Sequence, residues 1–145
     1  MHHLARHLLR CGIALFLLGL LTGLMVPVLN NPRMALSSHL EGILNGIFLM
    51  VLSLAWPQFR LSARAQKIAF GLVLFGTYTN WGTTLLAAAW GTGTMTPIAA
   101  PDHAGASWQE LIVNFGLVSL SIAMVVSCCI FIWGLRGTLV RTQED

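Results

Sequence analysis

The sequence predicts an all-α integral membrane protein: one four-helix transmembrane domain over residues 1–145, with both termini in the cytoplasm. The chain is 56% hydrophobic and only 9% charged, with a mean hydropathy of +0.75. Soluble domains carry about 25% charged residues. Four apolar runs also reach the roughly 20 residues that a hydrocarbon core of about 30 Å requires. We expect spans at about residues 8–29, 36–56, 68–90 and 111–135.

The distribution of basic residues sets the expected orientation. They precede the first run, separate the second from the third and follow the fourth: Arg6, Arg10, Arg60, Arg64, Lys67, Arg136 and Arg141. The other two connections hold only Arg33 and, in the later one, Asp102 with His103. By the positive-inside rule, we expect a multi-pass membrane protein with both termini in the cytoplasm. The net charge of +3 reflects this topology and gives no reason to expect nucleic-acid binding.

The first run carries glycines at 12, 19 and 23, which mark a close-packing side with no polar partner beyond Thr22. We expect this helix to be scaffold.

The second run is different, because its first turns contain an imidazole, a carboxylate and a carboxamide: His39, Glu41 and Asn45. At about 100° per residue, Glu41 and Asn45 share a stripe with Ser38, and His39 lies at its edge. An ionisable group inside a membrane helix costs roughly 2.5 to 3.5 kcal/mol even on the lenient insertion scale, so it is by default a functional candidate.

Gly42 and Gly46 lie on the same stripe as these polar residues. Their Gly-xxx-Gly spacing removes side chains from a strip of backbone, so that a second helix or a flat ligand can approach closely.

A simpler role for Glu41 is helix capping. If Ser38 is the N-cap, Glu41 occupies position N3 of a capping box, and Ser107 with Glu110 offers the same arrangement before the fourth run. Asn45 and Asn114 each follow their glutamate by four residues. The repeated Glu-x-x-x-Asn pattern is either internal similarity between the two halves or one capping solution used twice.

The third run holds a second polar stripe, formed by Thr77, Asn80, Trp81, Thr84 and Ala88 at helical spacing. Each threonine can bond to its own helix. Asn80 has more hydrogen-bonding groups than its backbone can satisfy, which implies a partner such as Asn45 or a ligand. The irregular segment 91–105 that follows is expected beside the start of the second helix, where it could cover a pocket entrance.

Several of these segments together resemble the small bacterial hydroxylaminobenzene mutases. They are residues 31–42 (NPRMALSSHLEG), 44–46 (LNG), 76–81 (GTYTNW), 90–93 (WGTG), 96–99 (TPIA) and 108–110 (WQE). The resemblance runs from about residue 12 to residue 125. It implies an isomerase that moves the N-hydroxyl oxygen of an arylhydroxylamine to the ring, giving a 2-aminophenol without external redox equivalents.

The chain is more distantly similar to styrene oxide isomerase, a trimeric four-helix membrane enzyme that uses ferric haem b as a Lewis acid. There a histidine binds the haem and an asparagine six residues later orients the substrate, a spacing that His39 and Asn45 match. The tyrosine of that isomerase, a turn beyond its third-helix asparagine, corresponds to about Thr84. The nearest tyrosine here is Tyr78, two residues before Asn80.

From the resemblance we hypothesise that His39 binds haem iron, with Gly42 and Gly46 beside the cofactor. Asn45 and Asn80 would then orient a small aromatic substrate and Glu41 would move protons, with Tyr78 as a further catalytic candidate. We expect a homotrimer surrounded by lipid, with the pocket between subunits.

Two other classes of function fit parts of the pattern. A small carrier would use Glu41 as a proton-coupled carboxylate. A haem-binding electron-transfer subunit would usually need paired histidines, whereas His39 is the only histidine inside the predicted runs.

Overall fold

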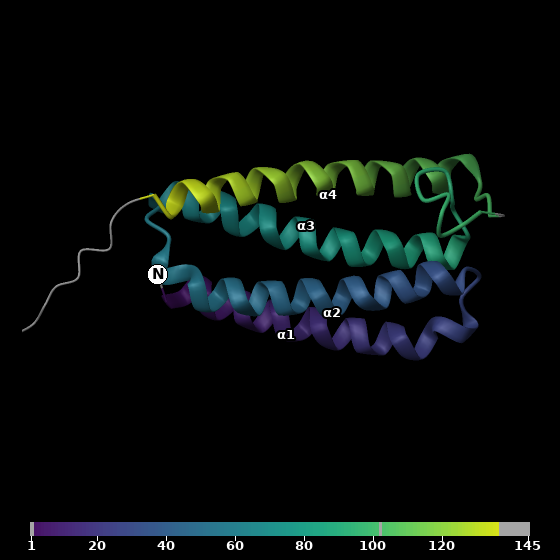
Figure 1. The fold of residues 1–145 in the computed structure, drawn as a ribbon, viewed down its shortest axis with the longest axis horizontal. Coiled ribbons are helices and arrows are strands. Elements are labelled where there is room, and N and C mark those ends of the chain that lie inside the picture. The colour runs from purple at the N-terminus through teal and green to yellow at the C-terminus, as the bar shows by residue number, and fades with distance from the viewer. Residues whose placement is uncertain (1, 102, 137–145) are drawn as a thin grey trace, which may run out of the picture.

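The computed structural model describes residues 2–101 and 103–136; Asp102 and Arg141 of the topology argument lie outside them. Four long helices run side by side (Figure 1). They are α1 (His2–Met25), α2 (Pro32–Ala55), α3 (Ala63–Trp90) and α4 (Ser107–Gly134), with one-turn 3-10 segments η1 (Val26–Val28) and η2 (Trp56–Gln58) after the first two. The described residues contain no strand, which confirms the all-α fold.

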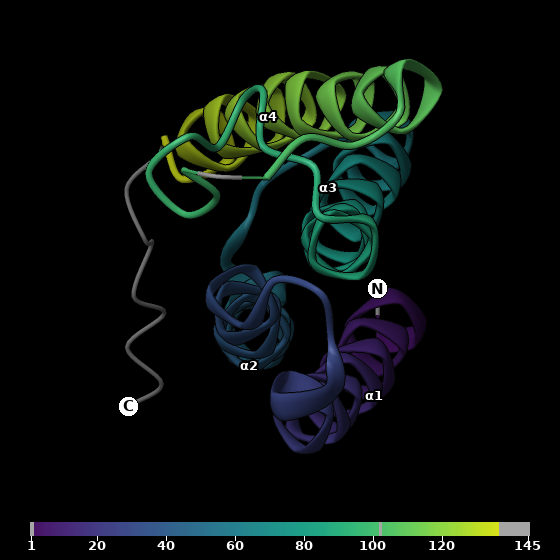
Figure 2. The ribbon, with the colours of Figure 1, turned by 90° about the vertical axis from the view of Figure 1, so that its right-hand side faces the viewer.

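The helices alternate in direction, so that the start of α1 and the end of α4 lie at the same end of the bundle (Figure 1). The view along the bundle shows α1 packed on α2, α2 on α3, and α3 on α4 (Figure 2). In this order α2 and α3 are central, and α4 makes its extensive helix contacts with α3 alone. The polar stripes predicted from the sequence lie on these two central helices.

Helix α2 begins earlier than expected, at Pro32 rather than near residue 36. Asn31 is its N-cap: the backbone is extended there, and the Asn31 Oδ1 accepts a hydrogen bond from the Met34 N–H at 3.1 Å. Proline at the first helical position suits this start because its missing N–H is not needed there. The prediction that Ser38 caps the helix is therefore wrong, and Glu41 lies in the third turn instead of at N3.

Helix α4 also begins earlier, at Ser107. Ala106 occupies the N-cap position, and the Gln109 Oε1 accepts a hydrogen bond from the Ala106 N–H at 2.8 Å. Gln109 is thus the N3 residue. The predicted capping role of Glu110 is wrong as well, because its carboxylate binds elsewhere.

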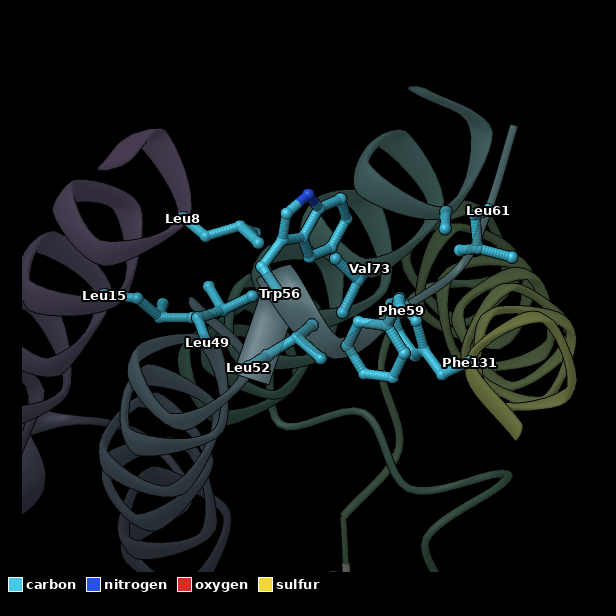
Figure 3. Close-up of a cluster of buried hydrophobic side chains, with 10 residues drawn as sticks. Leu8, Leu15, Leu49, Leu52, Trp56, Phe59, Leu61, Val73 and Phe131 are labelled. Carbon is cyan, nitrogen blue, oxygen red and sulfur yellow. The ribbon is translucent and has the colours of Figure 1, made fainter. Parts of the chain in front are cut away.

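The largest apolar core lies at the end of the bundle where the basic connector joins α2 to α3 (Figure 3). Trp56 meets Phe59 and Phe131 edge-on, with ring centroids 6.1 and 5.9 Å apart. Aromatic pairs prefer this geometry. Leucines of α1 and α2 complete the cluster, so residues from all four helices meet at this end.

Three helical segments of the described chain are long and apolar enough to cross a membrane: His3–Val28, Pro32–Gln58 and Ser107–Gly134. Helix α3 is not among them, although a fourth span was predicted at 68–90. Its polar stretch around Thr77, Thr83 and Thr84 lowers the hydropathy, and these three side chains are buried against protein. The central helix can carry them because its neighbours cover it.

Candidate functional site

A carboxylate and two carboxamides meet between α2 and α3. The Asn80 Nδ2 donates to the Glu41 Oε2 at 2.5 Å, and the Asn45 Nδ2 donates to the same oxygen at 3.3 Å. All three side chains are half-buried. We call Glu41, Asn45 and Asn80 the carboxylate cluster. Asn80 has a side-chain partner, as predicted, but that partner is Glu41, one turn before the expected Asn45.

The cluster leaves several acceptor atoms free. No described residue donates to the Glu41 Oε1 or to the side-chain oxygens of Asn45 and Asn80. A buried polar group normally finds a hydrogen-bond partner. These half-buried oxygens are thus available to a ligand that carries N–H or O–H groups, and Oε1 is placed to accept a proton.

His39 lies on a different side of α2 and contacts α1. Its Nδ1 is 2.8 Å from the Gly19 carbonyl oxygen. Because a carbonyl can only accept, Nδ1 carries the hydrogen, and in the neutral ring Nε2 keeps the lone pair with which imidazole binds metals. Positions two apart on a helix differ by about 200°, so the structure does not bring His39 to Glu41 within one subunit.

Gly42 and Gly46, expected beside a cofactor, lie against α1 instead. A Cβ on Gly42 would be 2.5 Å from the Gly19 Cα, and one on Gly46 would be 2.8 Å from the Gly12 carbonyl oxygen. Helix α1 thus occupies the strip that a flat ligand would need. The Gly-xxx-Gly spacing therefore lets a second helix approach in this structure, and not a flat ligand.

Cross-helix hydrogen bonds fix the register around the carboxylate cluster. The Trp81 Nε1 donates to the Thr22 Oγ1 at 3.0 Å, and the Thr22 hydroxyl donates to the Leu18 carbonyl at 2.8 Å. The Ser38 hydroxyl donates to the Trp81 carbonyl at 3.0 Å. The sequence pattern did not predict these links. Thr22 could have indicated them, because it carries the one hydroxyl group on the glycine-lined packing side of α1.

Tyr78 lies outside the carboxylate cluster. Its hydroxyl donates to the Cys11 carbonyl at 2.9 Å, which links α3 to α1. Asn80, two residues later, points to the other side of α3 toward Glu41. In this arrangement Tyr78 ties two helices together.

Glu110 binds the long connection between α3 and α4. Its Oε1 accepts from the Gly93 and Gly105 N–H groups at 3.0 and 3.1 Å, and its Oε2 accepts from the Thr94 N–H at 3.2 Å. One carboxylate thereby holds both ends of this loop. Asn114, one turn later, has a buried Oδ1 without a partner among the described residues.

The same loop packs over the start of α2, as predicted. The Asn31 Nδ2 donates to the Ala99 carbonyl at 3.2 Å, and the His103 Nε2 is 3.3 Å from the Asn30 carbonyl oxygen. A pocket of about 360 Å³ lies here, lined by Asn31, Pro32, Arg33, Ala99, Pro101 and His103. None of the predicted site residues lines it.

Sequence comparison relates this chain to known proteins. The family model of styrene oxide isomerase matches residues 4–136. Hydroxylaminobenzene mutase HabB of Ectopseudomonas oleovorans is 55% identical over 98% of this chain and 87% of its own length. Hydroxylaminobenzene mutase HabA of the same organism is 44% identical over 89% of this chain and 96% of its own. No solved structure matches significantly.

These relatives favour an enzyme over the carrier and the electron-transfer subunit. The match covers all four helices, including the carboxylate cluster and His39. The chain therefore belongs to the styrene oxide isomerase family and is an isomerase-type membrane enzyme.

Proposed function

We propose that this protein converts hydroxylaminobenzene-type arylhydroxylamines to 2-aminophenols by intramolecular hydroxyl transfer. The observation that carries the proposal is the carboxylate cluster, which offers a free carboxylate oxygen and two free amide oxygens inside a membrane bundle. The names of the two relatives support this choice of substrate.

The reaction is an isomerisation that balances without an oxidant. The hydroxyl group moves from nitrogen to the ortho ring carbon, so the N–O bond breaks and a C–O bond forms, and one proton moves from that carbon to nitrogen. Breaking the N–O bond requires stabilisation of negative charge on the departing oxygen. Restoring the aromatic ring then requires a base, and general acid–base groups typically contribute 10²- to 10⁴-fold to such steps.

Glu41 is suited to the proton transfer. Its Oε2 is occupied by the amides of Asn45 and Asn80, which fixes the carboxylate plane and leaves Oε1 to take the ring proton and return it to nitrogen. The side-chain oxygens of the two asparagines can accept from the N–H and O–H of the hydroxylamino group. The half-buried position between helices limits capture of the electrophilic intermediate by water.

The family resemblance also implies haem b, and His39 fits the role of its ligand. A ring that donates Nδ1–H to a backbone carbonyl keeps Nε2 free for iron, which is the usual arrangement of metal-binding histidines. When bound, ferric haem supplies a Lewis acid that stabilises charge developing on oxygen. His39 would hold the haem iron through its Nε2, and the haem would bring its remaining nitrogen ligands itself.

The separation of His39 and Glu41 supports a homo-oligomer, and the resemblance to styrene oxide isomerase makes a trimer our choice. Since they point to different sides of α2, a site that uses both needs His39 of one copy and Glu41 of another. Apolar residues on the outer surface offer contact area for lipid and for a second copy, for example Leu44 on α2 and Phe115 on α4, which are 61% and 74% exposed. We place the protein in the bacterial inner membrane with both termini cytoplasmic.

The test is an absorption spectrum of the detergent-purified protein, followed by anaerobic incubation with hydroxylaminobenzene. We expect a Soret band that disappears in His39→Ala, and 2-aminophenol from the wild type only. Turnover without a Soret band would retain the isomerase and remove the haem. Folded protein that yields neither band nor product, but shows Glu41-dependent proton flux in vesicles, would overturn the proposal in favour of a carrier.

A further inference from the structure

His39 is held from one side by a glycine-lined strip of α1. The Gly19 carbonyl lies 2.8 Å from the His39 Nδ1. One turn later, a Cβ on Gly23 would be 2.6 Å from that same nitrogen and 2.8 Å from the ring Cε1. The imidazole therefore rests directly on the backbone of α1. We call Gly19 and Gly23 the imidazole cradle.

Each cradle residue has a separate steric requirement. Gly19 itself meets backbone, since a Cβ there would be 2.6 Å from the Ile43 N atom, so only glycine lets α1 approach closely enough for its carbonyl to reach the ring. For Gly23, the three atoms nearest to an added Cβ all belong to the His39 ring. A side chain at 23 would therefore displace the imidazole before it displaced α2.

Other nearby hydroxyl groups do not compete for the ring. Thr22 lies between the two glycines, but its hydroxyl donates to the Leu18 carbonyl and accepts from the Trp81 Nε1. The Ser38 hydroxyl is likewise committed to the Trp81 carbonyl. The Gly19 carbonyl is the partner that the described residues give the His39 Nδ1.

We propose that Gly19 and Gly23 are positioning residues that hold His39 as the Nδ1–H tautomer with Nε2 directed to the ligand. The first helix, expected to be scaffold, then takes part in the site. Such a hydrogen bond fixes the ring and raises the basicity of the ligating nitrogen, and its loss typically costs 10- to 100-fold in metal affinity or activity. The ligand role of Nε2 rests on the proposed function, whereas the tautomer does not.

The test compares three alanine variants. Gly23→Ala disturbs the cradle. Gly12 lies about 16 Å from Gly23 along α1 and packs against the same helix. A Cβ on Gly12 would be 2.8 Å from the Gly46 carbonyl oxygen, so Gly12→Ala controls for α1–α2 packing. Gly82→Ala has nothing within 4 Å of its Cβ and controls for the substitution itself.

Two measurements report how the imidazole cradle holds His39. In ferrous haem-loaded protein, the resonance Raman iron–histidine stretch reports hydrogen bonding at Nδ1. In haem-free protein with ¹⁵N-labelled histidine, the ring nitrogen shifts of His39, assigned by their loss in His39→Ala, report the tautomer. We expect Gly23→Ala to lower the stretch frequency, shift the ring toward the Nε2–H form and reduce turnover by about 10- to 100-fold. Gly12→Ala and Gly82→Ala should preserve both signals.

Three results would overturn the proposal. They are a wild-type His39 in the Nε2–H form, a Gly23→Ala variant with unchanged spectra, and an equal change in Gly12→Ala, which would assign the effect to general helix packing. Absence of haem from the preparation would count against the proposed cofactor only, because the ¹⁵N measurement still reads the cradle.

Discussion

Two glutamates with the same sequence context have different surroundings in this bundle. Glu41 and Glu110 each precede an asparagine by four residues, and each was a candidate for helix capping. Glu41 accepts from two side-chain amides on two helices and keeps one oxygen free. Glu110 accepts from three backbone N–H groups of one loop, using both oxygens.

The difference supports the proposed catalytic role of Glu41 over one for Glu110. Backbone N–H groups are obligatory donors that must be satisfied wherever the loop is folded, so a carboxylate that serves three of them is committed to structure. Side-chain amides also bring acceptor oxygens that can be offered to a ligand. Glu110 therefore anchors the loop, and proton transfer remains our proposal for Glu41.

Glu41→Gln gives the sharpest test of this assignment and the largest expected effect. Glutamine has the same size and can still accept from Asn80, but it cannot take a proton. We expect kcat for arylhydroxylamine isomerisation to fall about 10²- to 10⁴-fold, with little change in melting temperature. Chromatography of the product measures kcat, and thermal unfolding in detergent measures the melting temperature.

The matched control is Glu110→Gln, the same substitution at the other carboxylate. It should keep kcat within about threefold. A loss of kcat at Glu110 equal to that at Glu41 would remove the distinction between the two sites.

Asn80→Leu should have the next largest effect. It removes the shorter of the two bonds to Glu41 Oε2 and one free amide oxygen, so we expect kcat/KM to fall about tenfold, equivalent to ~1.4 kcal/mol of transition-state stabilisation. Asn45→Leu, which removes the longer bond of 3.3 Å, should cost less. The opposite ranking in steady-state kinetics would mean that Asn45 is the main orienting amide.

Glu110→Ala should affect stability more than chemistry. Three backbone N–H groups in the loop lose their acceptor, and we expect the melting temperature to fall by about 2–4 °C. Limited proteolysis should cut the loop between α3 and α4 faster than in the wild type. Unchanged proteolysis and melting would show that the loop is held by other contacts, such as that between Asn31 and Ala99.

Much of the fold follows from the sequence, because hydropathy and charge act over whole helices. The helix starts were misplaced at Ser38 and Ser107, although Asn31 followed by Pro32 is itself a strong start signal. Helical spacing grouped Glu41 with Asn45 and indicated that Asn80 needed a partner. The contact of His39 with Gly19 depends on the rotation of α2 relative to α1 about the helix axes. The contact of Glu110 with Gly93 depends on the path of the loop between α3 and α4. Hydrophobic periodicity specifies neither.

Asn114→Leu has the smallest expected effect and completes the comparison between the two Glu-x-x-x-Asn pairs. The Asn114 Oδ1 is buried without a partner in the described part of the chain, so replacing it with an apolar group of similar size removes an unsatisfied acceptor. We expect stability to change by no more than about 0.5 kcal/mol or to rise slightly, and turnover to stay constant. By contrast, we expect the equivalent Asn45→Leu to lower turnover, because the Asn45 amide donates to Glu41. If Asn114→Leu instead abolishes turnover in folded protein, the orphan oxygen contacts substrate or a second subunit, and the two pairs are functional equivalents after all.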